Sequence, residues 1–192
     1  IDSGAMYRAV TLYFLENGIT VDNDKKIAEA LKNINIELQY PEGQFQIFLN
    51  GREITSRIKQ MDVSSYVSEV AAVPAVRRKL VEIQRQLGQH KGVVMDGRDI
   101  ASVVFPDAEL KIFVTAELDI RTERRFNELK NKSLQIQKSE VKENLIHRDY
   151  IDSNREDSPL IQTEDAILLD NSYLNREEQL TKVLKLIEAM NK

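Results

Sequence analysis

The chain has 192 residues, of which 42% are hydrophobic and 30% charged, with no cysteine and a net charge of −4. This balance is typical of a folded globular domain and excludes a disulfide scaffold or a thiolate metal site, and we expect a reducing, cytoplasmic setting. The modest negative charge argues against nucleic acid as a partner, and no apolar run approaches the roughly 20 residues of a membrane helix. Any anionic ligand must therefore meet local clusters of arginine.

The first third of the chain changes from a helical to a strand pattern. Residues 5–16 are a predicted helix because Met6, Val10 and Phe14 share one stripe, with Asp2 and Ser3 as candidate N-caps. A second helix is predicted over residues 24–33. Hydrophobic residues then alternate over 34–39 and 45–49, and an Asn-Gly turn leads to a short strand near 53–55. We expect a small antiparallel meander here.

The rest of the chain predicts an α/β core. A helical stretch over residues 64–88 contains Pro74, which should kink or divide it. The runs GVVMD, LKIFVTA and AILLD are typical of buried parallel strands, and helices are predicted over 117–130, over 139–154 and from 175. Strands that alternate with helices indicate a parallel sheet, with the meander as an insertion. The stretch KNKSLQIQKSE near 130–140 is predicted to be an exposed, mobile connection.

Charged residues follow the first of these apolar runs. Ligands bind at the carboxyl ends of strands in an open parallel sheet, which is where VVMDGRD places Asp96, Arg98 and Asp99. The alternative is an ordinary turn with a local Asp–Arg ion pair.

A second charged group lies in HRDYIDSNRED. Arg148, Asp152 and Arg155 are spaced so that they share one helix face. On spacing alone we favour an exposed ladder of weak salt bridges. The functional alternative is a pair of guanidinium groups beside a carboxylate, which could hold a phosphate and sugar hydroxyls together.

A third group, in DIRTERRFNEL, consists of Arg121, Arg124 and Arg125. Arginines beside a mobile stretch could close over transferring phosphates. The alternative is a solvated helix face on which Glu123 and Glu128 are the partners. The three groups together predict only a possible polyanion pocket.

The motifs DSGAMYRA, VSEVAAVPAVR, VVMDGRDIASVVFPDA, KIFVTA and RDYIDSNREDSPL occur in the order seen in bacterial cytidylate kinases, a family of nucleoside monophosphate kinases that this chain resembles over its whole length. The resemblance implies a three-layer P-loop kinase core with a lid and a monophosphate-binding insertion that contains an antiparallel sheet. In this chain the core would be residues 1–29, 68–120 and 139–192, the insertion 30–67 and the lid 121–138. The implied reaction transfers the γ-phosphoryl group of ATP to CMP or dCMP with Mg²⁺, in a protein that is monomeric when complete and has no metal site of its own.

The resemblance also implies a role for each matching residue. Cytosine would be read by Ser68, Arg77 and Asp99, the phosphate held by Arg8, Arg98 and Arg155, and the sugar contacted by Ser3, Arg148 and Asp152. The implied catalytic residues are Arg155 and the lid arginines Arg121, Arg124 and Arg125. A straight helix would place Ser68 and Arg77 on opposite sides, so a break near Pro74 must bring them together.

One expected motif is missing from the 192 residues. The family carries a G-x-x-x-x-G-K-[ST] loop for the phosphates of ATP on its first strand–helix unit, and no such string occurs here. We therefore expect the sequence to be a fragment of a complete kinase that is inactive by itself, and that a strand and a covering helix are missing from the sheet. Two alternatives are a non-catalytic nucleotide-binding module and a P-loop kinase for another small acceptor.

Overall fold

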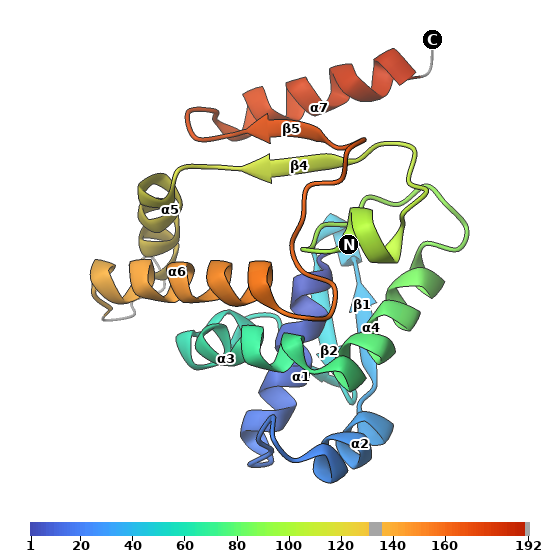
Figure 1. Cartoon of the computed structure of the whole chain (residues 1–192), viewed down its shortest axis with the longest axis vertical. Helices are drawn as coiled ribbons and strands as arrows, with labels where there is room; N and C mark the ends of the chain where they lie inside the picture. The colour runs from blue at the N-terminus through green and yellow to red at the C-terminus, as the bar shows by residue number, and fades with distance from the viewer. Residues whose placement is uncertain (131–135, 191–192) are drawn as a thin grey trace. The chain divides into compact units, whose positions relative to one another are not determined.

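The structure, a computed structural model, describes residues 1–130 and 136–190 of the chain (Figure 1). The mobile connection predicted near 130–140 lies partly outside these residues. The chain divides into two compact units, one formed by Ile1–Pro106 with Arg148–Ile161 and the other by Asp107–His147 with Gln162–Lys192. The first unit contains α1 (Ser3–Glu16), α2 (Asp24–Asn33), β1 (Ile36–Gln39), β2 (Gln46–Leu49), β3 (Arg52–Glu53), α3 (Met61–Ala72), α4 (Pro74–Leu87), the 3₁₀ turns η1 (Pro41–Gly43) and η2 (Arg57–Lys59), and the π-helical turn η3 (Ile100–Val104). The second contains β4 (Ile112–Thr115), α5 (Leu118–Lys130), β5 (Ile167–Asp170), α7 (Arg176–Met190) and the first part of α6 (Lys138–Asn154).

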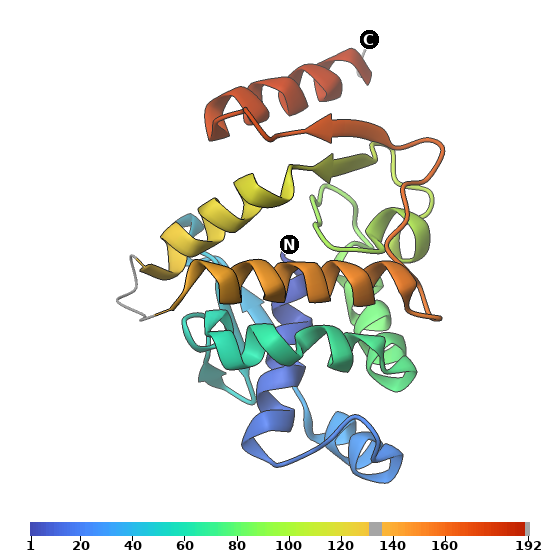
Figure 2. The ribbon, with the colours of Figure 1, turned by 60° about the vertical axis from the view of Figure 1, so that its left-hand side comes forward.

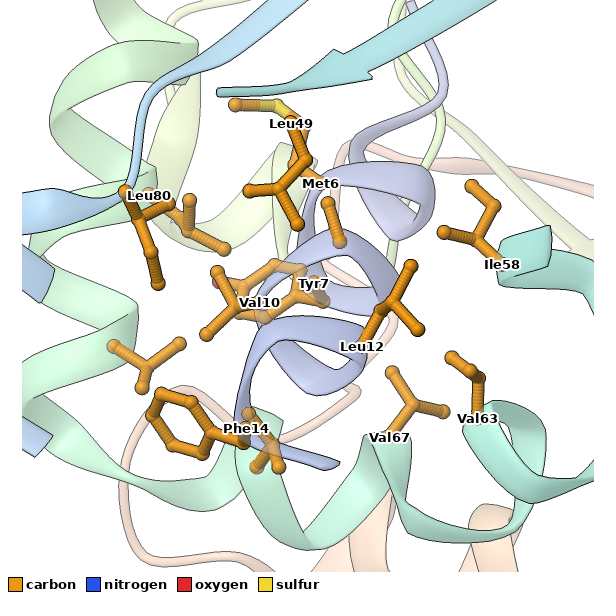
Figure 3. Close-up of a cluster of buried hydrophobic side chains, with 14 of the residues drawn as sticks. Met6, Tyr7, Val10, Leu12, Phe14, Leu49, Ile58, Val63, Val67 and Leu80 are labelled. Atoms are coloured by element: carbon orange, nitrogen blue, oxygen red, sulfur yellow. The ribbon is translucent and has the colours of Figure 1, made fainter. Parts of the chain in front are cut away.

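Helix α1 is the centre of the hydrophobic core of the first unit. The stripe predicted from the sequence is confirmed, since Met6, Val10 and Phe14 are all completely buried. Residues of α1 outside this stripe are buried too, which is typical of a helix enclosed on several sides. Figure 3 shows the apolar side chains of α1 surrounded by residues of β2, η2, α3 and α4. The core therefore holds α1 rigidly, together with the polar residues at its first turn.

The predicted meander is confirmed as a three-stranded antiparallel sheet in the order β1-β2-β3. Strands β2 and β3 are joined by Asn50 and Gly51, with φ angles of 50° and 78°. Two consecutive positive φ angles are what a type I′ hairpin turn needs, and Asn-Gly is the sequence that forms it most readily. One face of β2 is buried through Ile47 and Leu49, so the sheet packs on the core of the first unit.

The helical stretch around Pro74 is divided into two helices, as the sequence predicts. Helix α3 ends at Ala72, Val73 is extended with φ −70° and ψ 118°, and Pro74 begins α4. Proline disfavours a helical conformation at the residue before it but suits the first position of a helix, so the break falls at Val73. The change of direction allows residues of both helices to face the same region of this unit.

The buried strand predicted for GVVMD is wrong. Residues 92–95 form no strand, and Asp96 makes only an isolated parallel bridge with Asp2. Val94 is 81% exposed. A strand needs a partner along its length, and the described backbone bonds beside this run reach only Ile1 and Ser3, so the ladder does not extend. The short bridge still fixes the loop that follows Asp96.

The two later apolar runs do form strands. In the second unit β4 pairs with β5 in parallel, from Ile112 opposite Ile167 to Thr115 opposite Asp170. Figures 1 and 2 show α7 running beside β5. The prediction that these strands are buried is wrong, because Val114 is 51% and Leu168 56% exposed. Two strands cannot enclose both of their faces, unlike the central strands of a larger parallel sheet.

The α/β class with one parallel and one small antiparallel sheet is therefore confirmed. Among the described residues, no helix is both long and apolar enough to span a membrane.

Candidate functional site

A buried ion pair between Arg77 and Asp99 is the centre of the candidate site. Arg77 comes from the second turn of α4, and Asp99 precedes the π-helical turn η3. Their side chains are only 2% and 3% exposed, and Arg77 Nη2 donates to Asp99 Oδ2. Arg77 Nη1 also donates to the backbone carbonyl of Ala71 at 3.1 Å, close to the break between α3 and α4. Because a buried charge is costly without a partner, both groups must be held in place by the surrounding structure.

Tyr7 lies against this pair from α1. The Arg77 guanidinium carbon is 5.6 Å from the centre of the Tyr7 ring, a distance at which the cation and the aromatic face attract each other. The Tyr7 hydroxyl is buried and has no hydrogen-bond partner in the part of the chain that the structure describes. Burial, more than the nearby charges, raises the pKa of Tyr7 to about 12. The phenol is therefore a neutral polar group beside the ion pair.

Arg155 and Asp152 extend the cluster from the end of α6. Arg155 Nη1 lies 3.6 Å from Asp152 Oδ1, and Arg155 Nη2 lies 4.0 Å from Asp99 Oδ1. The Arg155 and Asp152 side chains are 3% and 6% exposed. Burial, and secondarily the nearby Arg77, lowers the pKa of Arg155, although a guanidinium stays charged in proteins. Arg98 reaches Asp152 from outside, with Nε donating to Oδ2 at 3.0 Å and a side chain that is 45% exposed.

The start of α1 adds a further guanidinium group, that of Arg8 in its second turn. The Asp2 carboxylate caps the helix by accepting from the Ala5 amide at 2.8 Å, and it also accepts from Arg8 Nη2 at 2.7 Å. The Ser3 hydroxyl donates to the Asp96 carbonyl at 2.6 Å. Gly97 allows this contact, because a Cβ there would lie 2.3 Å from Ser3 Oγ. The Asp2–Asp96 bridge therefore joins the start of α1 to the loop that carries Arg98 and Asp99.

The last two predicted acceptor residues, Ser68 and Arg148, lie on α3 and α6. Arg148, on α6, donates to the hydroxyl of Ser64 on α3 at 3.3 Å. Ser68 is on the next turn of α3 and is 2% exposed, and no hydrogen bond joins it to Arg77 or Asp99. All nine predicted acceptor-binding residues thus belong to the first unit, namely Ser3, Arg8, Ser68, Arg77, Arg98, Asp99, Arg148, Asp152 and Arg155.

Two interpretations made from local spacing are wrong. The Arg148, Asp152 and Arg155 face is not an exposed salt-bridge ladder, because Asp152 and Arg155 are buried. The DGRD motif is not a turn with an internal ion pair, because Arg98 pairs with Asp152 and Asp99 with Arg77. In both cases the partner comes from another part of the chain, which helical or turn spacing alone does not indicate.

The arginines predicted for a lid lie on α5 in the second unit. Arg124 donates to the side-chain and backbone oxygens of Asn171 at 3.0 and 2.7 Å and to the Ser172 carbonyl at 3.0 Å, all just after β5. Arg125 pairs with Glu128 at 2.7 Å, and Arg121 donates to the Ala116 carbonyl at 3.0 Å. The expected partner Glu123 bonds instead to Lys138 and Asn127.

Three residues of the cluster were not predicted as site residues from the sequence. Asp2 was expected only as a helix cap, Tyr7 was interpreted as core, and Asp157 was not considered. Asp157 Oδ1 lies 3.6 Å from Arg77 Nε. Asp157 is the last residue of the SNRED string, but its partner Arg77 is 80 residues away in sequence, and no local pattern connects the two.

The arrangement is suited to an anionic ligand that also carries a polar ring edge. Four guanidinium groups each lie beside at least one carboxylate, so each arginine is oriented before a ligand arrives. Such preorganised guanidinium groups bind phosphate in a bidentate manner. The buried carboxylate Asp99 can accept a hydrogen bond from an amine. Together these features suit a phosphorylated small molecule with a hydrogen-bonding ring.

Comparison with known proteins shows the family to which the chain belongs. The family model described as cytidylate kinase matches residues 1–189. The chain is 47% identical to the cytidylate kinase of Flavobacterium johnsoniae, covering 100% of this chain and 86% of that protein. It is 52% identical to the cytidylate kinase of Bacteroides thetaiotaomicron, covering 93% and 80% respectively, and 50% identical to that of Flavobacterium psychrophilum, covering 97% and 85%. The chain belongs to the cytidylate kinase family.

Proposed function

We propose that this kinase transfers the γ-phosphoryl group of ATP to CMP or dCMP, giving CDP or dCDP, and that the charged cluster of the first unit is its acceptor site. The observation that carries the site is the buried Arg77–Asp99 pair, surrounded by Arg98, Asp152 and Arg155. Burying so many charges is expensive unless they serve a ligand or one another. The names of the relatives support the reaction.

The base would be read by Asp99, Arg77 and Ser68. A carboxylate accepts from the exocyclic amine of cytosine, whereas Arg77 and Ser68 donate to the ring carbonyl and nitrogen. Uracil carries a carbonyl in place of that amine, so its carbonyl oxygen and the Asp99 carboxylate, both acceptors, would face each other. An unpaired buried acceptor costs more than a weak contact gains, so we expect strong rejection of UMP.

The monophosphate and the sugar would be held by the remaining groups. Arg8, Arg98 and Arg155 present guanidinium groups for the phosphate dianion, while Ser3, Arg148 and Asp152 face the sugar hydroxyls. A phosphate would compete with the carboxylates that now hold Arg8 and Arg98. Fixing the acceptor in this way helps to align its oxygen for attack on the γ-phosphorus.

The second unit would supply the lid. We propose that Arg121, Arg124 and Arg125 lie in a lid over residues 121–138, and that one of them, with Arg155, stabilises charge on the transferring group. Residues 30–67 would be the monophosphate-binding insertion, with 1–29, 68–120 and 139–192 as the core.

The cluster itself does not fit a metal ion. Its carboxylates face guanidinium groups, and no three acidic or imidazole side chains in the described ranges are grouped so that they could hold one. We propose that Mg²⁺ arrives with ATP, whose phosphate charge it neutralises. No G-x-x-x-x-G-K-[ST] string occurs in the 192 residues, and we assign none of them to the ATP phosphates.

The test is phosphoryl transfer from ATP by the full-length product of the gene, with CMP, dCMP, UMP and AMP as acceptors. We expect a clear preference for CMP and dCMP. Transfer to none of them would favour a non-catalytic nucleotide-binding module, and indifference among the bases would favour a kinase for another acceptor. Asp99→Asn should reduce the ratio of kcat/KM for CMP to kcat/KM for UMP, and this ratio does not depend on the amount of folded enzyme.

A further inference from the structure

The turn after α6 contains a second carboxylate directed at Arg77. Asp157 Oδ1 lies 3.6 Å from Arg77 Nε, which shares one edge of the guanidinium with the Nη2 that donates to Asp99. The Asp157 side chain is 38% exposed, whereas that of Arg77 is 2% exposed. Asp157 is thus more exposed than Asp99, the other ion-pair partner of Arg77, and it can be changed without opening the core.

This turn is built to hold Asp157 in place. Ser158 has a φ of 53°, a left-handed conformation that is strained for a residue with a Cβ. In this conformation the Ser158 hydroxyl donates to Asp157 Oδ1 at 2.5 Å, and the Ser158 carbonyl accepts from Arg155 Nε at 2.8 Å. The turn is closed by the Leu160 amide, which donates to the Asp152 carbonyl at 2.7 Å. One short segment therefore orients Arg77 through Asp157 and Arg155 through Ser158.

The consequence concerns how Arg77 holds Asp99. A guanidinium and a carboxylate alone prefer to pair through two parallel hydrogen bonds, which would occupy both oxygens of Asp99. Here Arg77 contacts only Oδ2, because Nη1 donates to the Ala71 carbonyl and Nε faces Asp157. Asp99 Oδ1 accepts no hydrogen bond from a described residue, and Arg155 Nη2 lies 4.0 Å from it, so this oxygen can accept from a ligand amine.

We propose that Asp157 is a positioning residue that sets base specificity, because its carboxylate attracts Nε of Arg77, leaves Asp99 bonded to Nη2 alone, and so keeps Asp99 Oδ1 available for the amine of cytosine. This inference rests on the proposed function. It predicts that removal of the Asp157 charge lets Arg77 rotate onto both oxygens of Asp99. Recognition of the amine is then weakened, while phosphate and sugar contacts are unchanged.

The experiment compares steady-state kinetics of the full-length enzyme and its Asp157→Asn variant with CMP and UMP. We expect kcat/KM for CMP to fall about fivefold because KM rises, which is the effect expected from losing a partly exposed ion pair. The kcat/KM for UMP should change less than about twofold. Ser158→Gly keeps the positive φ and the carbonyl but removes the hydroxyl, and should give a smaller change of the same kind. Glu156→Gln is the matched control, since it removes a neighbouring exposed charge and should leave both values unchanged.

Each outcome separates the inference from the proposed function. If the unaltered enzyme prefers CMP but Asp157→Asn behaves like Glu156→Gln, the positioning role is wrong and the proposed function stands. Equal losses on CMP and UMP would mean that Asp157 only supports the fold, which also overturns the inference. If the unaltered enzyme shows no preference for CMP, the proposed function itself fails.

Discussion

Two groups of arginine, on α6 and on α5, look alike in the sequence and differ in the structure. Arg155, directly after α6, is buried beside Asp152 and near Asp99. On α5, Arg124 bonds to oxygens after β5, and Arg125 pairs with a glutamate one turn along the same helix. The first arrangement orients charge in a water-poor environment, where electrostatic interactions are strong, and the second fixes a helix to a strand end. Arginine spacing on a helix therefore does not distinguish a buried charge cluster from a contact that joins two elements. The environment of the partner does.

The largest effect is expected when the central ion pair is broken. Asp99→Ala leaves Arg77 buried without its main counter-charge and should lower the free energy of unfolding by about 3–5 kcal/mol. Urea denaturation followed by circular dichroism measures the change. The double variant Arg77→Met with Asp99→Leu should regain much of the loss, because it removes both charges. An Asp99→Ala midpoint equal to that of the unaltered protein would contradict the burial of this pair.

A pair of leucine substitutions extends the comparison to the hydrophobic residues of the two units. Leu80 on α4 is completely buried, whereas Leu168 on β5 is 56% exposed. Leu80→Ala should destabilise the protein by about 2–5 kcal/mol because it leaves a cavity. Leu168→Ala should cost less than about 1 kcal/mol. Similar costs at both positions, measured by urea denaturation, would mean that β5 is covered in solution.

The buried phenol of Tyr7 predicts a dependence on alkaline pH. Its pKa is raised to about 12 in the folded protein, against 10.0 for an ordinary tyrosine. The contribution of neutral Tyr7 to the free energy of unfolding is complete below pH 10. It is lost as pH rises from 10 to 12, because in that range the tyrosine ionises only in the unfolded state. The loss is at most about 3 kcal/mol. Urea denaturation near pH 11 should show a smaller decline for Tyr7→Phe than for the unaltered protein. Identical declines would mean that Tyr7 titrates normally.

The smallest effect is expected on α5. Arg124→Ala removes hydrogen bonds to the Asn171 and Ser172 oxygens and should destabilise the protein by about 1–2 kcal/mol. Lys142→Ala is the control, since the Lys142–Asp119 pair is exposed and should contribute nothing measurable. Equal denaturation midpoints for the two variants would indicate that Arg124 is free to act elsewhere.

Local features of the fold were predictable because their causes are local. The stripe of α1, the Asn-Gly turn of the meander and the break before Pro74 each follow from a few adjacent residues. The strand predicted at GVVMD failed because a strand depends on a partner, and Val94 is exposed where a neighbour was expected. Hydrophobic runs indicate strand tendency but not the extent of the sheet that covers them.

Much of the candidate site could be predicted only through resemblance to a family. Residue spacing placed Arg148, Asp152 and Arg155 on a common face but favoured the wrong environment for it. The partners of Arg77, by contrast, come from three separate segments, at Ala71, Asp99 and Asp157. No periodicity in the sequence connects such positions, because tertiary packing alone brings them together.

The most direct test of the central claim compares the binding of CMP and cytidine by titration calorimetry. Arg98 is suited to this test because its side chain is 45% exposed, so Arg98→Gln should leave the fold intact. If the charged cluster is the acceptor site, the unaltered protein binds CMP more tightly than cytidine. Arg98→Gln should then lose about tenfold in affinity for CMP and almost none for cytidine, the expected loss of one charged hydrogen bond. Unchanged affinity for CMP, or equal losses for both ligands, would contradict the claim.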